Sequence, residues 1–209
     1  YGLVDCFTGV KMSGIAMIID GVTLKTGTQT LKSGLIGACK FENPYAGCSA
    51  GYNAIIRNCT IESGVIIGYT GESSEIGGFA GRMQGTVENC VNHGTVKGKN
   101  YVGGIIGTRD NAMGACDVQN CTFDGTVIAT GSNAGGIVGG GYSDSSAPNG
   151  IKVTVNGCTA SGTIVGDSNV GGVLGGDVYV VQAWNAYSFK DNTFTGKVSG
   201  NSNVGAIIG

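Results

Sequence analysis

One unit recurs along this chain, and its recurrence limits the fold more strongly than any other feature of the sequence. The clearest copy, VENCVNHGTVKGKNYVGGIIG, occupies Val87–Gly107. Further copies lie at 118–139, 155–175 and 189–209, a stretched copy at 56–81 and a weaker copy at 18–37. From Cys90 to Gly107 and from Cys158 to Gly175 is 17 residues, whereas the cysteines of successive copies are 31 to 37 residues apart. A fixed unit with connectors of variable length is typical of a stacked repeat array, in which each unit buries its apolar face against its neighbours.

Each unit contains three short runs rich in β-branched residues, which are VENCV, GTVKG and YVGGIIG in the clearest copy. Gly, Asn or Ser separates the runs, and none has apolar residues at i, i+3 and i+4 over the length of a helix. The pattern predicts an all-β fold, a parallel β-helix (β-solenoid) of about six coils whose equivalent residues lie roughly 4.8 Å apart along the stack. The usual hand of parallel crossovers predicts right-handed winding. A propeller is the rival fold, but three runs per unit fit poorly with four-stranded blades.

The expected organisation is one elongated domain. Residues 1–17 are expected to form a cap or a degenerate coil, and residues 18–209 a single β-solenoid built from the copies given above. Loop inserts are expected where the repeat is interrupted, at 38–54, 108–117, 140–154 and 176–188.

Stacking would align equivalent residues in columns. Glycine supplies 41 of the 209 residues, well above the usual ~7%, and at corners it permits positive φ and close backbone approach. Stacked asparagine amides would hydrogen-bond along the stack. The expected columns are Gly77, Gly103, Gly135 and Gly171; Val102, Ala134, Val170 and Val204; Val96, Val127, Ile164 and Val198; Cys59, Cys90, Cys121 and Cys158, ending in Asn192; and Asn133, Asn169 and Asn203, a ladder that Tyr101 and Glu75 interrupt.

The spacing of Val87 and Cys90 conflicts with simple strand alternation. Both belong to apolar columns, yet they are three residues apart, so a regular strand cannot point both inward. A bulge or corner near Asn89 would resolve the conflict.

The chain has eight cysteines, and the repeat argues against disulfides for the four in the column. Their side chains would be parallel rather than facing each other, so we expect buried free thiols that pack as small apolar residues. Cys39 and Cys48, in the longest insert, are the candidate disulfide. No CxxC pair is present, so we expect no zinc site, and we expect no cofactor.

Charge and hydropathy exclude several classes of partner. The chain has 12 basic and 14 acidic residues and a formal net charge of −2, without a basic stripe, so we expect no nucleic-acid binding. No polybasic patch is present, and no apolar run reaches the ~18 residues of a membrane span, so we expect no membrane insertion of this segment.

Catalytic residues are difficult to nominate. His93 is the only histidine, lies in a turn and lacks an evident triad partner. The charged residues just after the closing glycines could cluster at one corner, as in solenoid enzymes that cleave polysaccharides, or they could be ordinary surface charges. The candidate binding residues are these four, Arg82, Arg109, Asp110 and Asp177, together with the aromatic residues Tyr142, Tyr179 and Trp184 of the inserts.

The unit resembles the GLUG repeat of bacterial surface proteins. The resemblance rests on VGGIIG (102–107), AGGIVG (134–139), VGGVLG (170–175) and VGAIIG (204–209), with IGGFAG (76–81) as a looser copy. GLUG repeats are found in large secreted or wall-attached adhesin-like proteins and in non-catalytic regions of immunoglobulin A peptidases. The resemblance therefore implies a stalk or spacer that is extracellular, on a bacterial surface or secreted, with flanking repeats in a longer parent chain. The departures are Lys32 and Ser33 in the first copy and Asn192 in place of the cysteine in the last.

The sequence thus favours a non-enzymatic, adhesin-like stalk or spacer that binds a host glycan or surface protein through its loops. The first alternative is a carbohydrate-active or sugar-binding β-helix that uses the loop charges. The second alternative is an ice-binding solenoid, because threonines recur on successive coils at Thr122, Thr126, Thr159 and Thr163.

Overall fold

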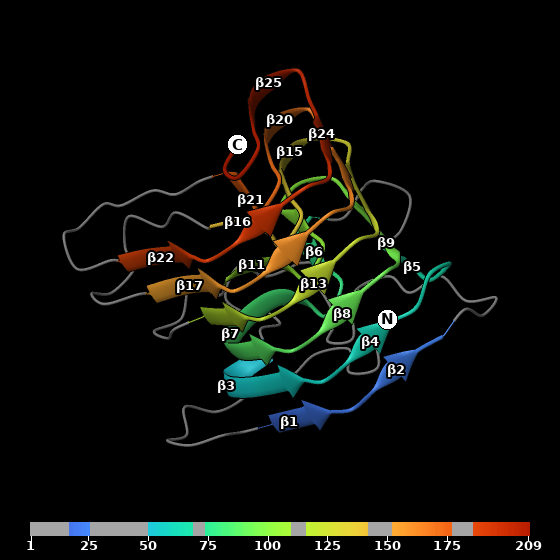
Figure 1. Ribbon diagram of the computed structural model, residues 1–209, viewed down its shortest axis with the longest axis vertical. Helices are drawn as coiled ribbons and strands as arrows, with labels where there is room; N and C mark the ends of the chain where they lie inside the picture. The colour runs from blue at the N-terminus through green and yellow to red at the C-terminus, as the bar shows by residue number, and fades with distance from the viewer. Residues whose placement is uncertain (1–16, 26–49, 69–73, 110–115, 142–151, 177–185) are drawn as a thin grey trace.

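The structure, a computed structural model, describes residues 17–25, 50–68, 74–109, 116–141, 152–176 and 186–209. Every regular element in these ranges is a β-strand. All pairings between these strands are parallel, and the strands form four sheets. The sheets wind round one apolar core, so the described chain is the β-solenoid that the repeat predicts (Figure 1).

The largest sheet has nine strands and combines the first strand of each coil with the strand that closes it. Its main order is β21-β16-β11-β7-β12-β17-β22, and β3 pairs with β7 and with β1. Its strands are β1 (Met17–Asp20), β3 (Ala50–Arg57), β7 (Ala80–Glu88), β11 (Ile106–Arg109), β12 (Cys116–Gln119), β16 (Val138–Gly140), β17 (Lys152–Asn156), β21 (Leu174–Gly176) and β22 (Ala186–Lys190).

Three smaller sheets form the other sides of the solenoid. The six-stranded sheet, turned toward the viewer in Figure 1, consists of β2 (Thr23–Leu24), β4 (Thr60–Ile61), β8 (Val91–Asn92), β13 (Thr122–Phe123), β18 (Thr159–Ala160) and β23 (Thr193–Phe194). One five-stranded sheet consists of β5 (Ile66–Ile67), β9 (Thr95–Gly98), β14 (Thr126–Ala129), β19 (Thr163–Val165) and β24 (Lys197–Ser199). The other consists of β6 (Ile76–Gly77), β10 (Val102–Gly103), β15 (Ser132–Gly135), β20 (Ser168–Gly171) and β25 (Ser202–Gly205).

Four complete turns can be followed in the described residues, one fewer at each end than the six coils predicted. They run from β3 to β7, from β7 to β11, from β12 to β16 and from β17 to β21. The strands β1 and β2 form a partial turn at one end, and β22 to β25 form another at the C-terminal end. Because no insert separates the first of these turns from the second, β7 closes one coil with its first residues and opens the next with its last.

The strand register confirms the apolar columns. Val102 pairs with Ile76 on one side and Ala134 on the other, and the column continues through Val170 to Val204. The second column, Val96, Val127, Ile164 and Val198, is likewise aligned residue for residue. Conserved spacing within the unit is therefore the sequence counterpart of in-register stacking.

A left-handed corner at Asn89 resolves the conflict between Val87 and Cys90. Asn89 has a φ of 52°, and both Val87 and Cys90 are fully buried, so the chain turns between two inward-pointing residues. Asparagine and glycine tolerate this conformation better than other residues do. The same corner has φ between 51° and 68° in every described coil, at Gly21, Asn58, Asn89, Asn120, Gly157 and Asp191.

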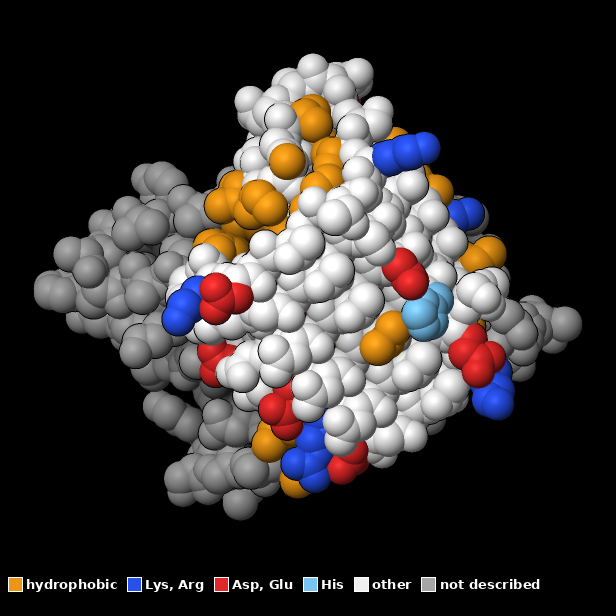
Figure 2. All heavy atoms as spheres, in the orientation of Figure 1, with side chains coloured by type: hydrophobic (Ala, Val, Ile, Leu, Met, Phe, Trp, Pro, Cys, Tyr) orange, Lys and Arg blue, Asp and Glu red, His pale blue; other side chains and the backbone are white. Residues whose placement is uncertain are grey.

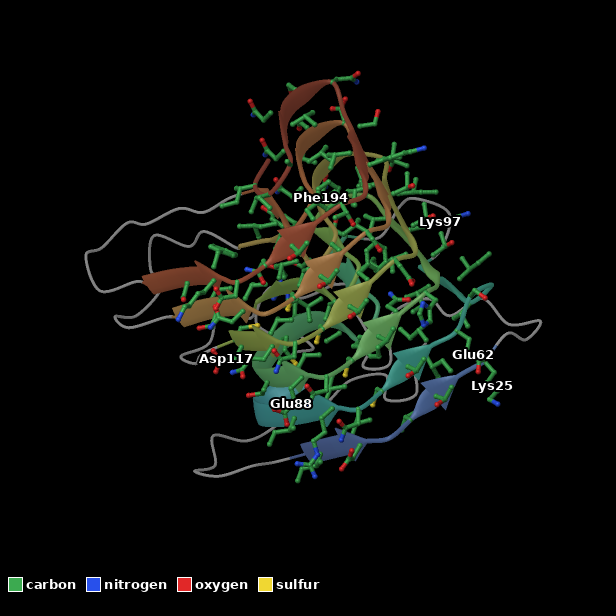
Figure 3. The ribbon with its side chains drawn as sticks, in the orientation of Figure 1. Lys25, Glu62, Glu88, Lys97, Asp117 and Phe194 are labelled. Carbon is green, nitrogen blue, oxygen red and sulfur yellow. The ribbon has the colours of Figure 1, made fainter. Side chains whose placement is uncertain are left out.

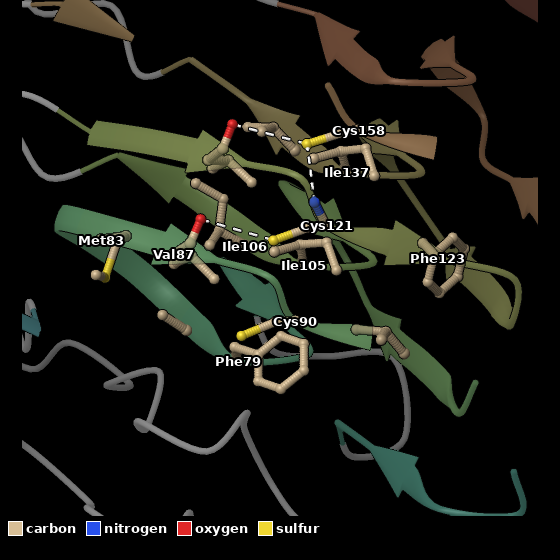
Figure 4. Packing of buried hydrophobic residues seen from close by; sticks show 14 of the residues in the cluster. Phe79, Met83, Val87, Cys90, Ile105, Ile106, Cys121, Phe123, Ile137 and Cys158 are labelled. Atoms are coloured by element: carbon tan, nitrogen blue, oxygen red, sulfur yellow. Dashed lines mark hydrogen bonds between the residues drawn. The ribbon is translucent and has the colours of Figure 1, made fainter. Parts of the chain in front are cut away.

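The core is narrow, and one glycine column makes its closest contacts possible. A Cβ at Gly104 would lie 2.5 Å from ring carbons of Phe123 and 2.1 Å from the carbonyl oxygen of Gly136, so no larger residue fits without a shift of the backbone. Figure 4 shows the aliphatic side chains of Ile105 and Ile137 inside the solenoid beside the column of cysteines.

Candidate binding surface

The structure describes two of the seven candidate binding residues, both in the largest sheet. Arg82 lies in β7, and Arg109 is the last residue of β11, paired in register with Met83 of β7. The two arginines therefore lie on adjacent paired strands, one residue apart in register, at the corner where the closing strands end. The other five candidates lie outside the described residues, as do the candidate disulfide partners: Asp110, Tyr142, Asp177, Tyr179, Trp184, Cys39 and Cys48.

Arg82 is held by a carboxylate that the sequence analysis did not assign to it. Its Nε donates to Glu75 Oε2 at 2.6 Å and its Nη2 to Glu75 Oε1 at 2.5 Å. The two side chains are only 14% and 11% exposed, so the bidentate pair is largely removed from water. Such pairs combine charge with a fixed geometry. Glu75 fixes the direction of the guanidinium, which is therefore not displayed as an isolated surface cation.

Glu75 begins a column of left-handed residues at this corner. The column has φ between 50° and 66° at Glu75, Tyr101, Asn133, Asn169 and Asn203. A positive φ is unusual for a residue as bulky as tyrosine. Tyr101 and Glu75, which were expected to interrupt the asparagine ladder, thus share its backbone conformation and differ only in their side chains.

The asparagines of this column form the hydrogen-bonded ladder expected from the sequence. Asn169 Nδ2 donates to Asn133 Oδ1 and Asn203 Nδ2 donates to Asn169 Oδ1, both at 2.8 Å. The ladder lies close against the closing strands, because a Cβ at Gly176 would lie 2.5 Å from the Cβ of Asn169. Glycine at that position therefore leaves room for the amides.

Thr108 occupies the rung that pairs with Arg82. Its side chain is fully buried, and its Oγ1 has no hydrogen-bond partner among the described residues. A buried hydroxyl without a partner costs roughly 1–3 kcal/mol. In the next two coils Gly140 and Gly176 take this position in the strand register. The corner therefore changes from charged and hydroxyl side chains to glycine toward the C-terminal end of the solenoid.

The recurring threonines lie on two different sides of the solenoid. Thr122 and Thr159 stack in the six-stranded sheet, whereas Thr126 and Thr163 stack in the five-stranded sheet that begins with β5. Val91 interrupts the first column and Lys197 ends the second. Of the four threonines only Thr163 is exposed, and the other three are partly buried.

Close contacts between polar or charged side chains link adjacent coils along the edges of the face shown in Figure 2. His93 Nδ1 lies 2.6 Å from Asp124 Oδ1, and Lys25 Nζ lies 3.9 Å from Glu62 Oε1. Figure 3 shows Lys25 and Glu62 at one side of this face and Glu88 and Asp117 at the other. All four residues of the two pairs are at least 39% exposed, so each pair contributes at most about 1 kcal/mol.

A third inter-coil pair lies at the lower edge. The Nη2 of Arg57 is 2.8 Å from Asp20 Oδ2, and Asn58 Nδ2 donates to Asp20 Oδ1 at 2.9 Å. The hydrogen bond from Asn58, followed by that from Arg57, lowers the pKa of the Asp20 carboxyl. The middle of the face, by contrast, carries mainly uncharged polar side chains and backbone (Figure 2).

The cysteine column lies in the core, away from every surface. Cys59, Cys90, Cys121 and Cys158 are free thiols no more than 1% exposed. Each thiol donates to the carbonyl two residues before it, as Cys121 does to Gln119 at 3.3 Å, and makes a longer contact to the previous coil, 3.6 Å to Val87 in that case. Hydrogen bonding to Cys158 and Cys90, together with burial, raises the pKa of Cys121.

The last coil ends this column with an amide. Asn192 Oδ1 accepts from the backbone N–H of Cys158 at 2.9 Å, and Asn192 Nδ2 donates to the carbonyl of Val155 at 2.6 Å. One coil earlier, the same backbone N–H of Cys121 meets only the sulfur of Cys158, at 3.4 Å. The departure at Asn192 therefore keeps the register and strengthens the contact with the preceding coil.

No three His, Cys, Asp or Glu side chains in the described ranges gather in a way that could hold a metal ion. No helix in the described part of the chain is long and apolar enough to cross a membrane. The feature that sequence reasoning missed is the Glu75–Arg82 pair, and the only available signal was that Glu75 departs from asparagine in the ladder column.

Comparison of the chain with protein-family models, with curated proteins and with solved structures found no match.

Proposed function

We propose that the chain is a non-enzymatic, extracellular module, an adhesin-like stalk or spacer of a bacterial surface or secreted protein. The observation that carries the proposal is the in-register stacking of coils that repeat one sequence pattern, in which backbone hydrogen bonds join each coil to the next. Each added coil lengthens such a stack by roughly 4.8 Å without requiring a new core. The resemblance to GLUG repeats supports the same role.

The proposed contact with a partner is through the segments that interrupt the repeat. Thr108, Gly140 and Gly176, near the ends of three closing strands, pair in one column. The segments that follow these strands are therefore attached at successive heights on one corner of the solenoid. A host glycan or a host surface protein is the proposed ligand, and flanking repeats are proposed neighbours in a longer chain.

Binding to an array of glycans and host proteins tests this proposal. Three variants, each with one of the segments 110–115, 142–151 and 177–185 replaced by a short Gly-Ser linker, would locate the contact. We expect at least one replacement to abolish binding while circular dichroism and thermal unfolding stay close to those of the parent. Binding that survives all three replacements, or no binding at all, would contradict the proposed route of contact.

The runner-up is a carbohydrate-active β-helix that uses the charges at the same corner. Of those charges, Arg82 is bound to Glu75, which gives a fixed guanidinium beside a buried carboxylate. A reducing-sugar assay on acidic and neutral polysaccharides, with Arg82→Gln and Glu75→Gln as variants, separates the two functions. For ice binding, the corresponding test is thermal hysteresis.

A further inference from the structure

The cysteines of the column stack in register, each directly above the one before. Val87 pairs with Val118 just before the corner, and Val91 pairs with Thr122 just after the cysteines. The carbonyl of Cys90 accepts from the N–H of Thr122 at 2.9 Å, and the same backbone hydrogen bond recurs at the other three cysteines of the column. Neighbouring cysteines therefore lie roughly 4.8 Å apart along the stack.

The thiols of this column point the same way, across the stack. Figure 4 shows the Cβ–Sγ bonds of Cys90, Cys121 and Cys158 side by side and in one direction. Hydrogen bonding with Cys121 lowers the pKa of Cys90 and of Cys158, so the neighbouring sulfurs are within reach of each other. A disulfide requires a dihedral angle of about 90° about its S–S bond, which two parallel Cβ–Sγ bonds do not provide. The column is therefore unsuited to disulfides, although its sulfurs are neighbours.

Two parallel thiols at this spacing fit a bridging metal ion instead. A metal–thiolate bond is about 2.3 Å long, so an ion that binds two sulfurs on opposite sides holds them about 4.6 Å apart. This span is close to the rise of roughly 4.8 Å from coil to coil. The metal–sulfur bonds would run along the stack, nearly at right angles to the Cβ–Sγ bonds, as the bent geometry of a two-coordinate sulfur requires. Zinc does not fit, because it takes four ligands and no three suitable side chains gather in the described ranges.

The apolar surroundings decide which charge the ion can carry. Val87, Ile105 and Ile137 beside the column are fully buried, and a net charge among such side chains is costly. A divalent ion that displaces one proton from each of two thiols leaves the charge of the core unchanged. Two S–H bonds break, two metal–sulfur bonds form, and two protons pass to the solvent. Thiolate sulfur favours soft metals, so the pair suits a soft divalent ion that needs only two ligands, such as Hg²⁺.

We propose that adjacent thiols of the cysteine column are binding sites for a soft, two-coordinate divalent metal ion. The thiols are no more than 1% exposed, so an ion enters only when a coil opens locally, and loading is slow. A bound ion joins two neighbouring coils through the core. The proposal does not depend on the proposed surface function.

The length of the column sets the number of ions. Val22 takes the position of the cysteine in the coil below, and Asn192 takes it in the last coil. Neither residue has a sulfur, so the column consists of four thiols. These can bind two ions at once, each held by one adjacent pair.

Uptake of Hg²⁺ by the folded chain tests the proposal. The starting chain has Cys6, Cys39 and Cys48 changed to serine, so that only the five described thiols remain. It is incubated with Hg²⁺ until the bound amount stops rising. Native mass spectrometry counts the ions bound and the protons lost per ion, and X-ray absorption gives the number of sulfurs around each ion.

Two double variants of the starting chain keep the same number of thiols in different arrangements. Cys121→Ala with Cys158→Ala keeps the adjacent thiols of Cys59 and Cys90. Cys90→Ala with Cys158→Ala keeps Cys59 and Cys121, which are two coils and roughly 10 Å apart. Cys116→Ala, which removes a buried thiol outside the column, is the control. Circular dichroism and thermal unfolding establish that every variant is folded.

We expect the starting chain and the Cys116→Ala control each to bind two ions that have two sulfurs apiece and displace two protons apiece. The double variant with adjacent thiols should bind one such ion, and the double variant with separated thiols should bind none. The proposal would be overturned by a starting chain that takes up no ion or holds each ion by one sulfur. Equal two-sulfur binding by the two double variants would overturn it as well, because the stacking of neighbours would then not form the site.

Discussion

At the scale of single residues, the cysteine column shows what the narrow core requires. The position follows a left-handed corner, so the side chain must be small, unbranched and apolar enough to be fully buried. A thiol meets these requirements and also offers a weak donor to the corner carbonyl, as Cys90 does to Glu88 at 3.3 Å. Serine would bury a hydroxyl that needs a stronger hydrogen bond, and a larger side chain would overfill the coil.

Thiol reactivity provides the prediction at this scale. In a chain with Cys6, Cys39 and Cys48 changed to serine, we expect the remaining thiols to resist a disulfide reagent until the protein unfolds. Burial raises the pKa of Cys59 and thus suppresses the reactive thiolate, and all five described thiols are at most 1% exposed. The measurement is the rate at which the protein thiols react, followed by the thiolate that the reagent releases, with and without urea. Rapid stoichiometric reaction of the native chain would show that the column is accessible.

At the scale of the elements, the sequence predicted the strands and columns but not the polar corner. Equal spacing within each copy gave the stacking register, and the three-residue spacing of Val87 and Cys90 required the corner at Asn89. The Glu75–Arg82 pair follows no repeat, because it occurs in only one of the coils that the structure describes. Periodicity reveals what coils share, whereas a contact specific to one coil depends on side-chain directions that a repeat pattern does not encode.

The corner itself can be tested by substitution at Asn89, which is exposed and has a φ of 52°. Asn89→Ala should lower the free energy of unfolding by about 1 kcal/mol, because Ala keeps the Cβ that disfavours left-handed backbone but lacks the short polar side chain with which Asn offsets that cost by local hydrogen bonding. Asn89→Gly should be close to neutral, since Gly157 and Gly21 occupy the same corner in other coils. Urea unfolding of both variants measures the difference. Ser161→Ala, at an exposed residue that does not have a positive φ, is the control, and equal effects of Ala and Gly at Asn89 would argue against backbone conformation as the cause.

At the scale of the whole molecule, stability resides in contacts between neighbouring coils. The described core is one continuous cluster, yet each inward residue packs mainly with its own coil and the coils directly above and below. A stack of this kind behaves approximately as a sum of coil terms and interface terms between neighbours. Removal of a complete coil should then shorten the solenoid without destroying it.

Excision of residues 121–157 tests this expectation. The deletion joins Asn120 to Cys158, so a left-handed corner is again followed by a buried cysteine, and Cys158 moves onto the coil of Cys90. We expect the shortened chain to fold. The slope of its unfolding free energy against urea concentration should be lower than that of the parent, in proportion to the surface removed. Excision of residues 121–138 removes fewer residues but deletes β13, β14 and β15, three sides of one coil, so it should prevent cooperative folding. Far-UV circular dichroism and urea unfolding compare the two, and if the smaller deletion were tolerated and the complete coil were not, the coil would not be the unit of stability.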